Sequence, residues 1–226
     1  IARLSSGDDI LTGITIEATP WAFAPVSADD ALSRKHGHLS DTARAPRNVR
    51  SRYCLFKTDV SDREWAILAE QLDTMIVQLS NYFKRPPQGS IQGFIVRDLA
   101  QWPAEILVEP IGVQKIAAGA GVCFGQRLGR RASATVYAAA KRGVIQHEVT
   151  HAYCVLAFGS SGDTWLSEGV AELGNYWTRD RDGVQIATQV LAYLRTERQR
   201  KPLSSIVASG DQPAGDWQDY AWRWSI

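Results

Sequence analysis

The chain has few cysteines and almost no net charge. Cys54, Cys123 and Cys154 allow at most one internal disulfide and leave an odd thiol, which argues against a scaffold built on disulfides. The 25 Lys and Arg residues against 24 Asp and Glu residues give a formal charge of +1, so no overall field attracts nucleic acid or an anionic membrane. We therefore expect no nucleic-acid partner.

Long apolar runs are also missing. No uninterrupted apolar stretch approaches the roughly 18 residues of a membrane-spanning helix, and no basic region followed by an apolar one stands at the start. The chain begins with Ile1 and ends at Ile226 inside an expected helix, so we interpret it as a fragment or processed product. Its 226 residues, 45% hydrophobic and 22% charged, are typical of a globular protein with a sizeable core.

Regular patterning is weak in the first part of the chain. Residues 11–16 could form a short strand, but residues 17–50 are rich in Pro, Ala, Ser, Asp and Arg and show no sustained periodicity. We expect residues 1–50 to be a mostly irregular N-terminal arm. Residues 51–226 would then be the folded domain, truncated at its C-terminus if the last helix continues past Ile226.

Strands and one long helix are expected next. Residues 51–57 have a strand pattern, and Ser61 with Glu64 forms a capping box that predicts a helix start. Apolar residues then recur every three or four positions as far as Phe83, so this helix should end before Pro86. Further strands are expected at residues 91–96 and, more weakly, 106–108, with a hairpin formed by residues 119–125 and 134–137.

Helical patterns dominate after residue 138. Four helices are expected: one through about residue 157, then about 165–177, about 184–198, and one from about 217. A mixed half followed by a helical half predicts an α+β fold.

One of these helices contains the pattern HExxH, as His147-Glu148-Val149-Thr150-His151. Positions four apart lie about 40° apart around a helix, so His147 and His151 can reach one cation. The opposite face of this helix is apolar and should face the core (Ile145, Val149, Ala152 and Leu156). Glu148 flanks the ligand side, where it could accept a proton from a metal-activated water.

The next helix supplies acidic residues. Glu168, Glu172 and Asn175 share one face, opposite an apolar face formed by Leu166, Val170, Leu173 and Trp177. Glu168 would complete a His2Glu site for one zinc ion per chain, with water in the fourth position, which is typical of catalytic zinc. Glu172 would orient a ligating histidine. Two alternatives remain open: a histidine pair without metal, and Cys154 as the third ligand.

The segment from His147 to Trp177, with HExxH followed by Trp165-Leu-x-Glu-Gly-x-Ala-Glu172, resembles the gluzincin metallopeptidases, most closely their peptidase-MA-like families. The resemblance implies a thermolysin-like domain: a small mixed sheet with a long helix, then a mostly helical half with the HExxH helix. It also implies His147, His151 and Glu168 as metal ligands, Glu148 as general base and Glu172 as a supporting carboxylate. The connection between the two helices should be tight.

The same resemblance implies further details of function. Tyr220, or less well Arg223, would donate to the developing oxyanion. Residues 119–123 lack the carboxylate with which gluzincin aminopeptidases hold a free amine, so we expect an endopeptidase acting on peptides or proteins. The alternative is an inactive zinc-containing domain that binds peptides or partner proteins. Relatives with this signature are often extracytoplasmic bacterial proteins, although nothing in the residues specifies the compartment.

Overall fold

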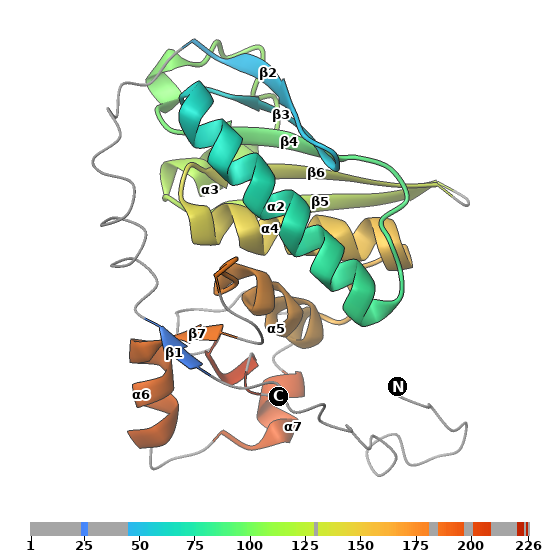
Figure 1. Ribbon diagram of the computed structural model, residues 1–226, viewed down its shortest axis with the longest axis vertical. Helices are drawn as coiled ribbons and strands as arrows, with labels where there is room; N and C mark the ends of the chain where they lie inside the picture. The colour runs from blue at the N-terminus through green and yellow to red at the C-terminus, as the bar shows by residue number, and fades with distance from the viewer. Residues whose placement is uncertain are drawn as a thin grey trace.

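A mixed five-stranded sheet forms the centre of the protein (Figure 1). The computed structural model describes residues 24–26, 45–128, 131–180, 185–196, 201–208, 221–223 and 225. In spatial order the strands are β2 (Arg47–Arg50), β3 (Cys54–Thr58), β4 (Ile91–Val96), β6 (Arg131–Ala139) and β5 (Gly121–Leu128). The three inner strands are parallel, and each outer strand is antiparallel to its neighbour. A small parallel sheet pairs β1 (Ala24–Val26) with β7 (Gln185–Ala187).

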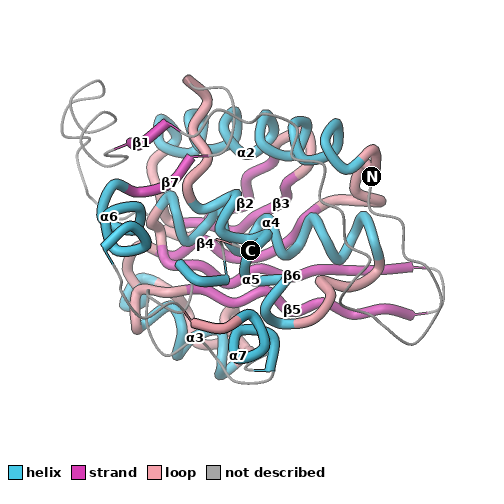
Figure 2. Tube along the Cα trace, turned by 90° about the horizontal axis from the view of Figure 1, so that it is seen from below, coloured by secondary structure: helices cyan, strands magenta, loops and turns pink. Residues whose placement is uncertain are grey.

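Helices cover both faces of the large sheet (Figures 1 and 2). One face packs against α2 (Asp62–Phe83) and α4 (Arg142–Phe158). The other packs against α3 (Pro110–Ala117) and the short 3-10 helix η1 (Leu99–Gln101). Next to α4 lies α5 (Thr164–Asn175), and beyond it α6 (Thr188–Thr196) and α7 (Leu203–Ala208) lie with the small sheet.

The long helix α2 begins where the sequence predicts. The backbone N–H of Ser61 donates to Glu64 Oε2 at 2.9 Å, and the backbone N–H of Glu64 donates to Ser61 Oγ at 3.2 Å. These bonds satisfy amides that have no partner within the helix. The helix ends at Lys84, which is left-handed at φ 55°, just before the two prolines. The capping box and the length of this helix are confirmed.

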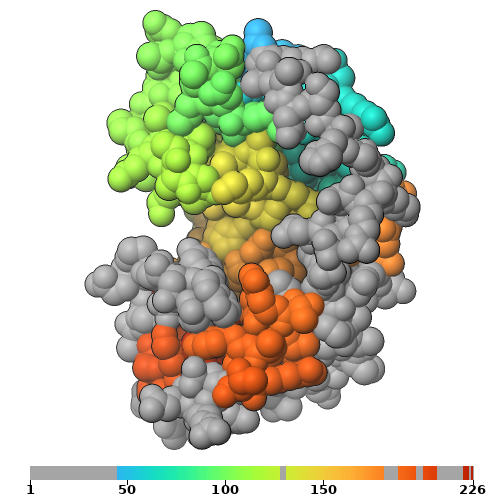
Figure 3. All heavy atoms as spheres, turned by 90° about the vertical axis from the view of Figure 1, so that its left-hand side faces the viewer, coloured from blue at the N-terminus to red at the C-terminus, as the bar shows by residue number. Residues whose placement is uncertain are grey.

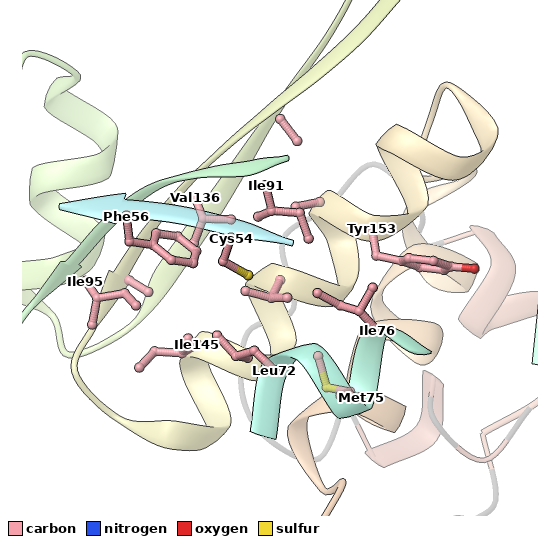
Figure 4. Packing of buried hydrophobic residues seen from close by; sticks show 14 of the residues in the cluster. Cys54, Phe56, Leu72, Met75, Ile76, Ile91, Ile95, Val136, Ile145 and Tyr153 are labelled. Carbon is pink, nitrogen blue, oxygen red and sulfur yellow. The ribbon is translucent and has the colours of Figure 1, made fainter. Parts of the chain in front are cut away.

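The main core lies between the sheet, α2 and α4. Figure 4 shows Leu72, Met75 and Ile76 of α2 directed at strand residues such as Phe56 and Ile91. Successive residues of a strand point to opposite faces of the sheet, so each inner strand contributes side chains to the apolar packing on both faces. In β6, Val136 belongs to this core, whereas Tyr137 packs with Phe94 and Trp102 under α3.

Most of the predicted strands are confirmed, and three expectations are wrong; the strand expected at residues 11–16 lies outside the described residues. Residues 185–187, expected within a helix from about residue 184, form β7, and α6 begins only at Thr188. Residues 91–96 form β4, and the expected hairpin is the antiparallel pair β5 and β6. Residues 106–108 form no strand; they are turn and coil leading into α3, which the periodicity did not predict. Residues 47–50, expected to be irregular, form β2, because pairing with β3 satisfies their backbone although their side chains have no apolar pattern.

The architecture is consistent with the predicted α+β class, since helices predominate after β6. Among the described residues, no helix is both long and apolar enough to span a membrane. All three cysteines are free thiols.

The core predicts a clear contrast between two leucines. Leu72 is 0% exposed in the main core, whereas Leu55 on β3 is 43% exposed. We expect Leu72→Ala to lower the free energy of unfolding by about 2–5 kcal/mol, because it leaves a cavity. Leu55→Ala should cost less than about 1 kcal/mol. Urea unfolding of both variants measures this, and equal losses would contradict the packing described.

Candidate metal centre

Three ligand atoms from α4 and α5 converge on one point. Nε2 of His147 lies 3.1 Å from Nε2 of His151 and 3.1 Å from Oε2 of Glu168. The remaining separation, from His151 Nε2 to Glu168 Oε2, is 3.6 Å. A tetrahedral zinc ion with bonds of about 2.0–2.1 Å separates its ligand atoms by about 3.3 Å. The residues predicted as ligands are therefore brought together at distances that fit a metal ion.

The other ring nitrogen of each histidine has its own partner. His147 Nδ1 lies 2.8 Å from Glu172 Oε1, and because a carboxylate only accepts, Nδ1 donates. His151 Nδ1 lies 2.9 Å from Ser167 Oγ, which can accept from it. In this tautomer each histidine carries its proton on Nδ1, and the lone pair of each Nε2 points to the position between the three ligand atoms. A metal ion at that position requires this tautomer. Asn175 Nδ2 donates to both oxygens of Glu172, at 3.2 and 3.0 Å.

Glycines allow α4 and α5 to approach closely. A Cβ atom at Gly143 would lie 2.3 Å from Asn175 Oδ1, and one at Gly174 would lie 2.0 Å from Thr150 Oγ1. The connection between the helices is residues 159–163, as tight as predicted. It begins at Gly159, whose φ of 88° ends α4 in a left-handed turn. This turn and the close packing bring Glu168 and Glu172 against the histidine face.

The site requires positive charge. Burial disfavours a charged His147, but its hydrogen bonds to Glu168 and Glu172 outweigh that effect and raise its pKa to about 10. Burial by itself would raise the pKa of Glu168, yet hydrogen bonds from the two histidines hold it well below its usual range. Without a metal ion, a proton on His147 therefore offsets the negative charge of Glu168 and Glu172. A divalent cation would compensate them more completely at the same position.

Glu148 lies beside the cluster, and its carboxylate is not one of the converging ligands. It is 7% exposed, and burial raises its pKa. The strand β5 passes directly over it: a Cβ atom at Gly121 would lie 2.6 Å from Glu148 Cγ. Gly121 thus leaves room for the predicted general base.

A cavity of about 470 Å3 lies above these residues, between α4, β5 and the start of α5. His147, Glu148, His151 and Glu168 line it, together with one side of β5. In Figure 3 the yellow segment that includes α4 reaches the surface between green and orange segments. The cluster is accessible to a ligand because His147 and Glu168 line the cavity, with side chains that are 12% and 19% exposed.

Other predicted residues do not join the cluster. Tyr220 lies outside the described residues. Arg223 is 4% exposed and does not line the cavity. Cys154, the alternative third ligand, lies in the main core, where burial raises its pKa to about 12. Glu168 is the residue that completes the cluster.

Two features of the site were not predicted. Ser167 lies about 100° from Glu168 around the helix, and no spacing in the sequence indicates that it contacts His151. The apolar face expected for α5 is only partly correct, since Leu166 is 46% exposed whereas Ser167 and Glu172 are buried. The reason is that α5 packs on α4 through its polar and small residues, where the hydrogen bonds form.

No protein-family model matches the chain, and no curated protein gives a significant match. The function must therefore be inferred from the site itself.

Loss of one ligand should abolish metal binding. We expect about one zinc per chain in wild type and little in Glu168→Ala, with zinc raising the melting temperature of wild type only. Metal analysis and thermal unfolding measure both. Glu105→Ala, at an exposed loop position, is the matched control and should behave as wild type. Absence of bound metal in wild type offered zinc would contradict the assignment and favour the protonated histidine pair.

The contact of Ser167 predicts a smaller effect. Ser167→Ala should lower zinc affinity by about 10–100-fold, because His151 loses the partner that orients its ring. Ser133→Ala, at an exposed position of β6, should leave affinity unchanged. Competition with a chelating dye measures both variants, and equal affinities would show that Ser167 has no orienting role.

Proposed function

We propose that the protein is a zinc-dependent endopeptidase of gluzincin type, with His147, His151 and Glu168 as metal ligands. The observation that supports this most directly is the convergence of these ligands beside Glu148 in a cavity bordered by a strand. The resemblance of residues 147–177 to gluzincin metallopeptidases supports the same function.

The donor set suits zinc. Two imidazole nitrogens and one carboxylate oxygen form a three-ligand site of the kind found in zinc hydrolases, and the cavity leaves a fourth position for water. When bound, zinc would act as a Lewis acid that lowers the pKa of that water and polarises the scissile carbonyl.

Glu148 is the proposed general base. Glu148 lines the cavity together with the proposed ligands, and its carboxylate would there be within reach of the attacking water. It would accept the proton of the water and deliver it to the amine nitrogen as the peptide bond breaks. Glu172 and Ser167 would hold His147 and His151 in orientation during these steps.

The strand β5 offers a binding mode for the peptide. It is the outermost strand of the sheet next to β6, and it borders the cavity. An extended peptide can pair with the free edge of such a strand through backbone hydrogen bonds. Among the described residues, Glu148 and Glu168 are the only carboxylates that line the cavity, so no further acid is available to hold a free amine. This favours cleavage within a chain over removal of its first residue.

A peptide-binding domain without turnover is the alternative function. The edge of β5 would serve it equally well, because backbone pairing does not require chemistry at the metal. The two functions differ in whether bound peptides are hydrolysed.

The role of Glu148 can be tested directly. Glu148→Gln should keep about one zinc per chain and lose at least about 100-fold in hydrolysis of a peptide library, because the amide cannot accept the proton. Mass spectrometry of the library and metal analysis measure the two properties. Glu105→Gln is the matched control. Wild-type hydrolysis by Glu148→Gln would overturn the mechanism, and retention of uncleaved peptides by wild type would favour the binding domain.

A further inference from the structure

One lysine lines the cavity at the metal centre. Lys115 lies in the last turn of α3, and its backbone carbonyl accepts at 2.9 Å from the N–H of Ala120, the residue before β5 begins. It therefore stands at the end of the cavity where Gly121 lies against Glu148. Burial raises the pKa of Glu148, and the positive charge of Lys115 is among the charges that act in the opposite direction. The ammonium group is thus near the proposed general base.

The end of α3 does not require this charge. A basic residue in the last turn of a helix commonly offsets the carbonyls that lack partners there. In α3 the carbonyls of Gln114, Lys115 and Ile116 accept from the backbone N–H groups of the three residues that follow the helix. In addition, Nζ of Lys141 donates to the carbonyl of Gly119 at 3.0 Å. These bonds satisfy the helix end without the side chain of Lys115.

The two carboxylates that line the cavity leave Lys115 without a direct partner. Glu168 faces the Nε2 atoms of His147 and His151, at 3.1 and 3.6 Å. Glu148 is influenced by the lysine charge but forms no ion pair with it. Within the described part of the chain, the side chain of Lys115 makes no hydrogen bond or ion pair. An ammonium group on a flexible stem can therefore pair with an anion that enters the cavity.

From these contacts we propose that Lys115 binds a carboxylate of the peptide close to the bond that is cleaved. Since Lys115 and Glu148 lie at the same end of β5, both would act on the same part of a peptide paired with that strand. A strand advances about 3.3 Å per residue, and the four-carbon stem of lysine spans about two such steps. We therefore expect the carboxylate within about three residues of the cleaved bond. This inference rests on the proposed function and specifies its substrates.

The carboxylate can come from an Asp or Glu side chain or from the free C-terminus of the peptide. The first set of test peptides is extended, uncharged and blocked at both ends, with one Glu moved through each position and Gln as the reference. A second set carries no Glu and ends in a free C-terminus at successive positions, with blocked ends as the reference. A preference confined to one set identifies the source of the carboxylate.

Fluorescence anisotropy with zinc-loaded Glu148→Gln protein measures binding without cleavage. We expect the carboxylate to improve binding about fivefold at one or two neighbouring positions, because water partly screens its pair with an exposed lysine. The preference should weaken as salt is added.

Variants of Lys115 test whether this side chain causes the preference. Lys115→Gln should remove it, and Lys115→Glu should shift it from Glu toward Lys. Because Lys115 is exposed, the fold should tolerate both changes. Lys84→Gln is the matched control, since Lys84 is also exposed but does not line the cavity. A preference caused by the zinc ion itself would survive in Lys115→Gln. That survival, or equal binding of each peptide and its reference at every position, would overturn the proposal.

Cleavage of the same peptides by wild type, with Glu148 in place, separates this proposal from the proposed function. Mass spectrometry locates the cleaved bond and so its distance from the preferred carboxylate. Zinc-dependent cleavage with no preference for a carboxylate would overturn the role of Lys115 and leave the endopeptidase intact. A preference in binding that depends on Lys115, without any cleavage, would support the role of Lys115 and overturn the endopeptidase in favour of the binding domain.

Discussion

Two carboxylates of α5 must be compensated where they pack against α4, and the organisation of the site depends on this requirement. Glu172 is 3% exposed, and a buried carboxylate without partners would be strongly unfavourable. His147 and Asn175 donate to it, while Glu168 one turn earlier faces the Nε2 atoms of both histidines. The same contacts that satisfy the carboxylates orient the histidine rings. The interface between the helices therefore also brings together three side chains that could hold a metal ion.

The hydrophobic core fixes the orientation of α4 at its interface with α5. Ile145, Val149 and Leu156 of α4 are buried against the sheet and α2, so the histidine face is directed away from the core without help from a metal ion. The sheet also places β5 along α4, where glycines at positions 121 and 125 keep the strand close to Glu148 and Val155. The scaffold thus brings His147, His151 and Glu168 together with Glu148 and β5, the outer strand of the described sheet.

Features with a local physical cause were predictable from the sequence. The capping box of Ser61 and Glu64 depends only on residues three apart, and the helix that follows it was expected correctly. The same holds for the ligand and core faces of α4, because helical geometry relates His147 to His151 without reference to the rest of the chain. The placement of Glu168 and Glu172 on one face of α5 is equally local. The spacing of these residues along the two helices was therefore enough to predict which residues form the candidate site.

Only the tertiary structure decided which surfaces meet. The strand β2 has no apolar pattern and forms because β3 offers backbone partners. Residues 106–108 have a strand-like composition but pair with no strand of the described sheets. Leu166 is exposed and Ser167 buried because α5 packs through its small and polar side. The contacts of Ser167 with His151 and of Glu172 with His147 join residues on different helices. Spacing along one element cannot reveal them, since they depend on how separate elements pack.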